Sequence, residues 1–415
     1  MKRNNIKLFS GEKGENYLFP FILITSLFFL WGCAHSLLDV LNSHFQEILH
    51  ISKAKSALVQ FSLYGGYFVM GIPAGLFIKK YGYKRGIITG LLLFCVGAFL
   101  FYPATYLKTF LSFLIPLFVI ACGLTCLETA ANPYTTILGP KQSAARRINL
   151  AQSFNGLGWV LGPLFGGALI FSGGDPFEVL SFPYIIIGFT VLFIAMFFII
   201  TPLPVIAEDN VQTERLENQG KGAYKDLIRH PLFVFAVIAQ FFYVAGQTGI
   251  GSFFINYVLE VEPDYNHLEA SQMLAIGGMG LFMIGRMSGS YMMKRIDAKS
   301  LLTIYAAVNI VLMIVVMLGL GMLSVVCLFL SYFFMSIMFP TIFALGISDM
   351  GIYREKASSI LVMCVAGGAV VPMLMGYIAD ISSMTVGFVV PLICFGVVLA
   401  FGLSKKSNKI ETQMY

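Results

Sequence analysis

The stretch GLFIKKYGYKR at residues 75–85 begins with a small residue, Gly75, near the end of an apolar run, and continues as a turn that carries four basic residues. A related stretch, GSYMMKRID at residues 289–297, follows Gly285 and Arg286 in the second part of the chain. The same helix end and basic turn therefore occur twice, at corresponding places. This repetition predicts a chain made of two halves that share one arrangement of helices.

Composition places these halves in a membrane. Of 415 residues, 58% are hydrophobic and 12% are charged, whereas an ordinary soluble domain has about 25% charged residues. Apolar runs recur along the whole chain, each long enough to cross a hydrocarbon core of roughly 30 Å. The first run is too long to be a removable signal peptide. We therefore expect an all-α integral membrane protein with 12 transmembrane helices in two six-helix halves. The expected helices are residues 18–43, 56–79, 86–104, 108–137, 147–172, 181–201, 231–258, 269–293, 300–319, 322–347, 356–380 and 386–404.

The basic residues indicate how the chain is oriented. Lys and Arg fill the N-terminus, the even-numbered loops and the C-terminal tail, whereas the odd-numbered loops hold only Lys53, Lys55 and Lys108. By the positive-inside rule, both termini are expected on the cytoplasmic side of the membrane. We expect that membrane to be a bacterial inner membrane. This topology explains the formal charge of +6, so a nucleic-acid partner is not expected.

A polar segment separates the two halves. Residues 202–230 interrupt the apolar pattern with acidic and amide side chains. We interpret them as a cytoplasmic linker between an N-terminal half, 1–201, and a C-terminal half, 231–404, with a cytoplasmic tail at 405–415. The seven cysteines all fall in expected helices without metal-site spacing, so packing is favoured over disulfides or ligation. No cofactor is expected apart from the proton as coupling ion.

The segment CLETAANPY at residues 126–134 puts the carboxyl group of Glu128 inside the fourth helix. A charge at such depth costs roughly 2.5–3.5 kcal/mol on insertion scales, so an acid there is rarely without function. Burial favours the neutral acid, which can bind hydroxyl groups and release its proton when water enters. Alternatively, Glu128 pairs permanently with a buried cation, for which Arg286 is the candidate. Asn132 lies one turn further along the same face.

Asp39 stands near the outer end of the first helix, with His35 one turn before it. Asp39 either ends the span at the interface or faces a cavity as a protonatable gate. The i,i+4 spacing allows His35 and Asp39 to interact. His35 can carry protons or hydrogen-bond to a ligand or to Asp39.

Amide side chains recur on the helices that follow. Gln152 and Asn155 lie at i,i+3 on the fifth helix, and Gln240, Tyr243 and Gln247 share one face of the seventh. Amides offer both donors and acceptors to the hydroxyl groups of a ligand, but they also hold transmembrane helices together. Because no carboxylate falls in the middle of the last six helices, proton chemistry is expected in the N-terminal half.

Six strings carry a family resemblance: FLWG at 29–32, GYF at 66–68, PAG at 73–75, the segment 126–133, LGP at 138–140 and NLAQSFN at 149–155. The sequence resembles the major facilitator superfamily over essentially the whole chain, and these strings resemble its fucose:proton symporter family. That resemblance implies the major facilitator fold and import of L-fucose or a related hexose with a proton, by alternating access. It also ties Asp39 to proton uptake. The sequence departs from the superfamily's loop motif at Lys79, where an acidic residue is usual, and from the family's pattern at His35 and Ser36, where two Asn are usual.

The sequence predicts both a function and a set of site residues, and it leaves three other functions open. One rival is a glucose/galactose or amino-sugar transporter of the same family, although such relatives usually have a neutral residue in place of Glu128. A drug/proton antiporter and a non-transporting sugar sensor are the others. An enzyme is not expected, and the protein is expected to be a monomer. The proton-coupling candidates are Asp39 and Glu128, and the substrate-binding candidates are His35, Glu128, Asn132, Gln152, Asn155, Gln240 and Gln247.

Overall fold

The computed structural model describes residues 8–9, 16–49, 58–170, 175, 177–201, 203 and 224–404, with side chains except at 38–49, 141, 163–170, 224–225, 267–268, 271, 352, 370 and 380. The longer helices of the first half are α1 (Leu18–Leu49), α3 (Leu58–Tyr81), α4 (Tyr83–Leu107), α5 (Phe110–Ile137), α6 (Ala144–Ile170) and α7 (Glu178–Ile200). Those of the second half are α10 (Pro231–Val261), α12 (Met279–Met292), α13 (Ala298–Met317), α14 (Met322–Met335), α15 (Met338–Ile347), α16 (Arg354–Met363), α17 (Gly367–Ile381) and α19 (Val389–Leu403). Short elements are η1 (Lys141–Ser143), α9 (Tyr224–Leu227), α11 (His267–Gln272), η2 (Met273–Gly278), η3 (Gly351–Tyr353), η4 (Cys364–Ala366) and α18 (Met384–Gly387).

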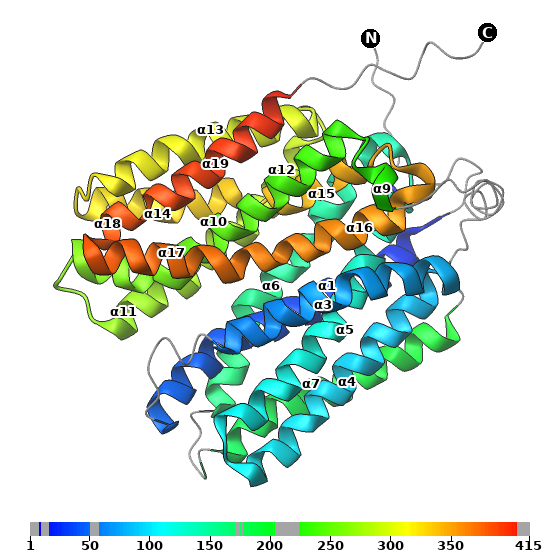
Figure 1. The fold of residues 1–415 in the computed structure, drawn as a ribbon, viewed down its shortest axis with the longest axis horizontal. Helices are drawn as coiled ribbons and strands as arrows, with labels where there is room; N and C mark the ends of the chain where they lie inside the picture. The colour runs from blue at the N-terminus through cyan, green and yellow to red at the C-terminus, as the bar shows by residue number, and fades with distance from the viewer. Residues whose placement is uncertain are drawn as a thin grey trace.

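The helices form two bundles side by side (Figure 1). One bundle contains α1 and α3–α7, and the other contains α10–α19. Helix α1 begins and α19 ends at the same end of the molecule (Figure 1), which we call the terminal end. Helices satisfy their backbone hydrogen bonds internally, as lipid requires.

The expected twelve-helix fold is confirmed. In the described part, ten helices are long and apolar enough to span a membrane. Helix α6 and the segment from α11 to α12 complete the set. These two are also the helices that carry Gln152, Asn155 and Arg286, so their polarity belongs to the site described below.

Some expected helices are not continuous. The span expected at 269–293 consists of α11, a π-helical turn at Met273–Gly278 and α12. The span expected at 322–347 breaks between α14 and α15. Apolar composition runs unbroken through both places, so the pattern gave no sign of the interruption. Single π turns inside helices often accompany functional sites, and η2 is followed directly by the helix that carries Arg286.

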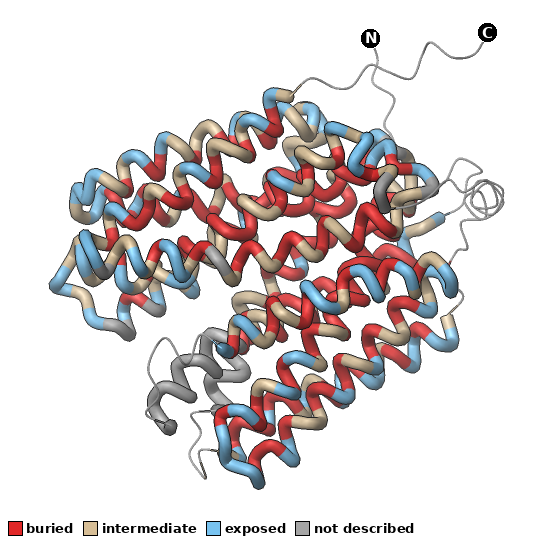
Figure 2. The backbone as a smooth tube through the Cα atoms, viewed as in Figure 1, coloured by how far each residue is buried: buried red, intermediate tan, exposed pale blue. Residues whose placement is uncertain are grey.

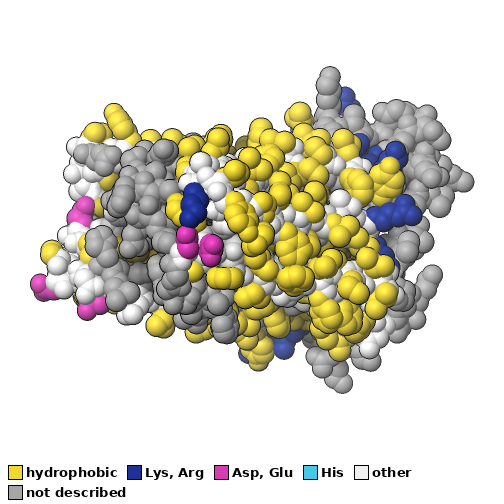
Figure 3. Space-filling view, turned by 90° about the horizontal axis from the view of Figure 1, so that it is seen from below, with side chains coloured by type: hydrophobic (Ala, Val, Ile, Leu, Met, Phe, Trp, Pro, Cys, Tyr) yellow, Lys and Arg dark blue, Asp and Glu magenta, His cyan; other side chains and the backbone are white. Residues whose placement is uncertain are grey.

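The outer surface is suited to lipid. Buried residues gather along the inner faces of the helices (Figure 2), while large apolar side chains such as Phe61, Phe189 and Ile200 are exposed. On the face seen in Figure 3, hydrophobic side chains form a broad belt, and most visible Lys and Arg side chains lie at the terminal end. The belt and the basic end agree with the orientation that the loops predict.

Close approach of α1 and α6 fixes the position of the N-terminal wall of the site. A Cβ atom on Gly32 would lie 2.1 Å from the backbone oxygen of Asn155, and one on Gly158 would lie 2.3 Å from that of Phe29. Only glycine allows such backbone contact, the usual way in which transmembrane helices pack tightly. Asn155 then donates to the backbone oxygen of Phe28 at 3.1 Å.

Arg147 is an exception among the basic residues that the sequence assigns to the even-numbered loops. It follows Arg146 directly but is fully buried. Its guanidinium donates to the backbone oxygens of Thr135 at 3.2 Å and Pro140 at 2.9 Å, and also to that of Thr136. Arg147 thus satisfies carbonyl groups that the end of α5 leaves without helical partners. It holds the end of the helix that carries Glu128.

Candidate substrate and proton site

A cavity of about 150 Å³ lies between the two bundles. The first bundle lines it from α1, α3, α5 and α6, and the second from α10, α12, α14 and α15, together with η2 and η4. By volume it has room for roughly ten waters, or one ligand of about a dozen non-hydrogen atoms. A small ligand there would contact both halves at once.

Glu128 forms the acidic centre of this cavity. Its side chain is 1% exposed, and its Oε1 accepts a hydrogen bond from the Tyr67 hydroxyl at 2.6 Å. The same hydroxyl lies 3.0 Å from Nε2 of His35. A continuous hydrogen-bonded relay therefore connects Glu128, Tyr67 and His35. Glu128 Oε2 has no hydrogen-bond partner among the described residues.

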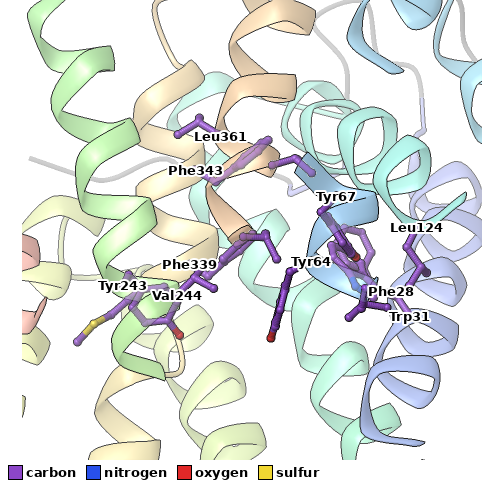
Figure 4. Packing of buried hydrophobic residues seen from close by; sticks show 14 of the residues in the cluster. Phe28, Trp31, Tyr64, Tyr67, Leu124, Tyr243, Val244, Phe339, Phe343 and Leu361 are labelled. Carbon is purple, nitrogen blue, oxygen red and sulfur yellow. The ribbon is translucent and has the colours of Figure 1, made fainter. Parts of the chain in front are cut away.

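Aromatic rings surround His35. The ring centres of Trp31, Tyr67 and Trp159 lie 6.3, 5.8 and 6.0 Å from that of the imidazole. Trp31, Tyr64 and Tyr67 project from the first bundle, and Val244 and Phe339 stand on the second (Figure 4). This arrangement provides flat apolar surfaces next to hydrogen-bonding groups, as small-molecule sites usually do.

Arg286 reaches from the second bundle to the first. Its guanidinium donates to the Gln152 backbone oxygen at 2.7 Å, to Gln152 Oε1 at 3.1 Å and to Asn155 Oδ1 at 2.9 Å. It also donates to the backbone oxygen of Ser336 and lies over the ring of Phe282. Among the described residues, no ion pair joins it to Glu128. The alternative of a permanent Glu128–Arg286 pair is not what this structure shows.

The cavity extends away from the terminal end. Its lining runs from Glu128 and Arg286 at mid-depth to Gln60, near the start of α3, and Ser252, towards the end of α10. On the terminal side the bundles are closed against each other. Hydrogen bonds across that closed seam join Tyr83 to Glu355 (2.9 Å), Thr129 O to Ser358 (3.0 Å), Asn149 to Thr341 (3.1 Å) and Arg146 O to Ser290 (3.1 Å).

The structure brings together most of the residues expected from sequence. His35, Glu128, Gln152, Asn155 and Gln247 line the cavity. Two other candidates, Asn132 and Gln240, are fully buried outside its lining, one turn nearer the terminal end. The remaining candidate, Asp39, lies on α1, but its side chain is outside the described residues.

The sequence reasoning missed the contribution of Tyr67, Trp159 and Tyr64. Tyr67 belongs to the GYF string, but its partners are 32 and 61 residues away in the chain. No local spacing could indicate them. Trp31 could have been identified from the sequence, because it precedes His35 by four residues and so shares a helix face with it.

Two helical bundles suited to a membrane, with a cavity that both of them line and that is closed on the terminal side, are typical of a membrane transporter. A family model described as Major Facilitator Superfamily matches residues 24–372. The chain therefore belongs to the major facilitator superfamily, and its relatives place it in the fucose:proton symporter family.

Relatives of known name match nearly the whole chain. The L-fucose-proton symporter of Escherichia coli (strain K12) is 36% identical over 411 residues, covering 94% of this chain and 93% of that protein. The glucose/galactose transporter of Brucella abortus biovar 1 (strain 9-941) is 34% identical over 396 residues, covering 94% of each.

Solved structures agree with the fold. The crystal structure of a Major Facilitator Superfamily transporter, FucP, in the outward conformation has a TM-score of 0.81 at 35% identity, covering 93% of this chain and 98% of that chain. The proton:xylose symporter XylE, at 13% identity and a TM-score of 0.73, covers 92% of this chain and 94% of that one and shares the fold alone.

Proposed function

We propose that this protein is a proton-coupled sugar symporter that imports L-fucose or a related hexose by alternating access. The observation that carries the proposal is the Glu128–Tyr67–His35 relay on the wall of a cavity the size of one monosaccharide. Symporter and sugar-transporter names among relatives of equal length support it. An apolar pocket for bulky drugs is disfavoured by the amides on both walls.

Proton uptake follows from the hydrogen bonds of the relay. With Glu128 ionised, the Tyr67 hydroxyl donates to Glu128 Oε1 and accepts from N–H at His35 Nε2. A proton arriving at His35 Nδ1 allows the Nε2 proton to pass to Tyr67 and the Tyr67 proton to pass to Glu128. The step leaves a neutral acid at Glu128, a neutral Tyr67 and His35 protonated at Nδ1, so one proton has entered and none is lost.

The amide side chains and aromatic rings around Glu128 recognise the sugar. Arg286 holds the side-chain oxygens of Gln152 and Asn155, which fixes the orientation of both amides. Gln247 faces them from α10. Hydroxyl groups of a sugar can bond to these amides and to Glu128, while Trp31 and Trp159 cover the apolar face of the ring.

The orientation and coupling complete the proposal. The terminal end faces the cytoplasm of a bacterial inner membrane, with residues 202–230 as linker and 405–415 as tail, and the protein works as a monomer. Asp39 is the outer proton gate. One proton per cycle at 100 mV supplies roughly 2.3 kcal/mol, enough for roughly a 50-fold sugar gradient.

A panel of radiolabelled sugars in proteoliposomes tests the function. L-fucose should accumulate when an inward proton gradient is imposed and not when it is absent. Preferential accumulation of glucose or galactose would favour a glucose/galactose transporter of the same family. If L-fucose, glucose and galactose all fail to accumulate while another solute does, the sugar assignment is rejected. Asp39→Asn should lose accumulation yet keep counterflow.

A further inference from the structure

Several buried amide side chains at the closed seam have at least one polar atom without a hydrogen-bond partner in the described part of the chain, although Asn132 Oδ1 accepts from Gln152 and Asn149 Nδ2 donates to Thr341. Asn132 Nδ2, Asn149 Oδ1 and both amide atoms of Gln240 have none among the described residues. All three side chains have 0% exposure. An unsatisfied buried polar group lowers stability by about 1–3 kcal/mol, so each requires an explanation in a native structure.

These three residues share one position relative to the cavity. Asn132 follows the cavity residue Glu128 by four positions on α5, and Asn149 precedes Gln152 by three on α6. Gln240 precedes Val244 by four on α10, on the face that continues to Gln247. Given the direction of each helix, every one of them lies one turn closer to the terminal end.

Contacts between the bundles cover this layer. Asn149 Nδ2 donates to Thr341 Oγ1 at 3.1 Å across the seam, and the Thr129 backbone oxygen accepts from Ser358 at 3.0 Å. Nearer the terminal end, a Cβ on Gly75 would lie 2.6 Å from Cβ of Ser359. Separation of the bundles at this end would therefore expose the three amides together.

We infer that Asn132, Asn149 and Gln240 form a second, inner sugar subsite that operates when the halves open at the terminal end. The inference rests on the proposed function. Amides that are unsatisfied in the closed seam gain partners from sugar hydroxyls and water in the open one. A hexose leaving Glu128 moves one helical turn to this subsite on its way to the cytoplasm.

Cysteine labelling in inside-out membrane vesicles tests the inference. The variants are Asn132→Cys and Gln240→Cys, with Ala130→Cys and Ala239→Cys as equally buried neighbours off the shared face. A membrane-impermeant thiol reagent is added, and each site is quantified by mass spectrometry, which separates it from the native cysteines. L-fucose at acidic pH should increase labelling at 132 and 240 and leave 130 and 239 unlabelled.

A second arm separates this inference from the sugar assignment. Tyr83→Phe with Ser358→Ala removes two hydrogen bonds across the seam and should increase labelling at 132 and 240 without any sugar. If labelling at 132 and 240 increases in the seam variant but not when L-fucose is added, the result supports the inner layer and rejects L-fucose as the substrate. Equal labelling at all four positions, or none in either arm, overturns the inference.

Gln240→Leu provides a measurement that does not depend on labelling. Because leucine removes unsatisfied polar atoms, the sugar-free variant should melt at a higher temperature than wild type. The half-saturation concentration for L-fucose efflux should rise about fivefold, with that for influx unchanged. A lower melting temperature, or equal changes in efflux and influx, would contradict the inner subsite.

Discussion

The two walls of the cavity differ in the kind of charge they carry. The first bundle contributes the relay of Glu128, Tyr67 and His35, whose protons can move. The second contributes Arg286, a guanidinium that stays protonated in proteins, amid apolar residues such as Val244 and Phe339. One wall can therefore change its charge during a cycle, and the other cannot.

Arg286 links these two kinds of chemistry. It donates to the two amides of α6 and not to Glu128, so the fixed cation orients sugar-binding groups on the opposite wall. The carboxyl group is left available to a proton or to substrate. In the proposed function, proton transfer therefore belongs to the first bundle, whereas the second bundle holds the amides of α6 in place and adds Gln247 to the groups that face the sugar.

Removing the Glu128 carboxyl group, whose charge can change during transport, should have the largest effect on sugar binding. Glu128→Ala deletes an acid that bonds to Tyr67 and, in the proposal, to sugar. Since hydrogen bonds to charged groups contribute about 1.5–3 kcal/mol, sugar affinity should fall roughly 10- to 150-fold. Equilibrium binding of L-fucose in detergent measures it, with the exposed acid variant Glu178→Gln as control. Unchanged affinity would return Glu128 to a structural role.

Substitution of Arg286, whose charge is fixed, should have the next largest effect on sugar binding. Arg286→Lys keeps the charge but loses the planar guanidinium, whose Nη1 reaches Gln152 and Asn155 while its Nε donates to the Ser336 backbone oxygen. Loss of two oriented bonds predicts about tenfold weaker sugar binding. The pH dependence of uptake should remain as in wild type, because the titrating wall is intact. A displaced pH profile with unchanged affinity would reverse the division between the walls.

Tyr67→Phe sharpens the comparison further. It removes one oxygen and breaks the relay on both sides while leaving the ring in place. Proton-driven uptake should slow about fivefold, whereas sugar counterflow, which needs no net proton transfer, should be unchanged. Equal losses in both assays would mean that Tyr67 serves packing or sugar binding instead of proton transfer.

The smallest effect is expected far from both walls, at the loop contact between Lys108 and Asp175. A hydrogen bond from the Lys108 ammonium at 2.7 Å, with one from the Phe177 N–H, lowers the pKa of the Asp175 carboxyl. Its contribution to stability is therefore present above the unfolded pKa of about 4 and is lost as the pH falls through the lower folded value. Exposed pairs contribute little, so Lys108→Ala should leave transport unchanged. Any difference in melting temperature at pH 7 should vanish in acid.

The sequence was sufficient for the helices but not for the contacts between them. Hydrophobic length and the alternation of basic loops predict the twelve spans, because lipid imposes both. The depth of Glu128 and the amides of α6 could be predicted for the same reason. The Tyr67 contacts and the reach of Arg286 across 131 to 134 residues could not, because they depend on how helices pack. Asn132 and Gln240 were predicted as site residues from a shared helix face, which does not reveal that they lie one turn below the cavity.

The most direct test of the account is sugar-induced proton uptake by proteoliposomes, followed with a membrane-impermeant pH dye outside. L-fucose added to wild-type vesicles should make the medium more alkaline. Glu128→Gln keeps a hydrogen-bonding side chain without a titratable proton, so it should exchange L-fucose in counterflow while moving no protons. Alkalinisation by Glu128→Gln equal to that of wild type would contradict the assignment of the coupled proton to Glu128.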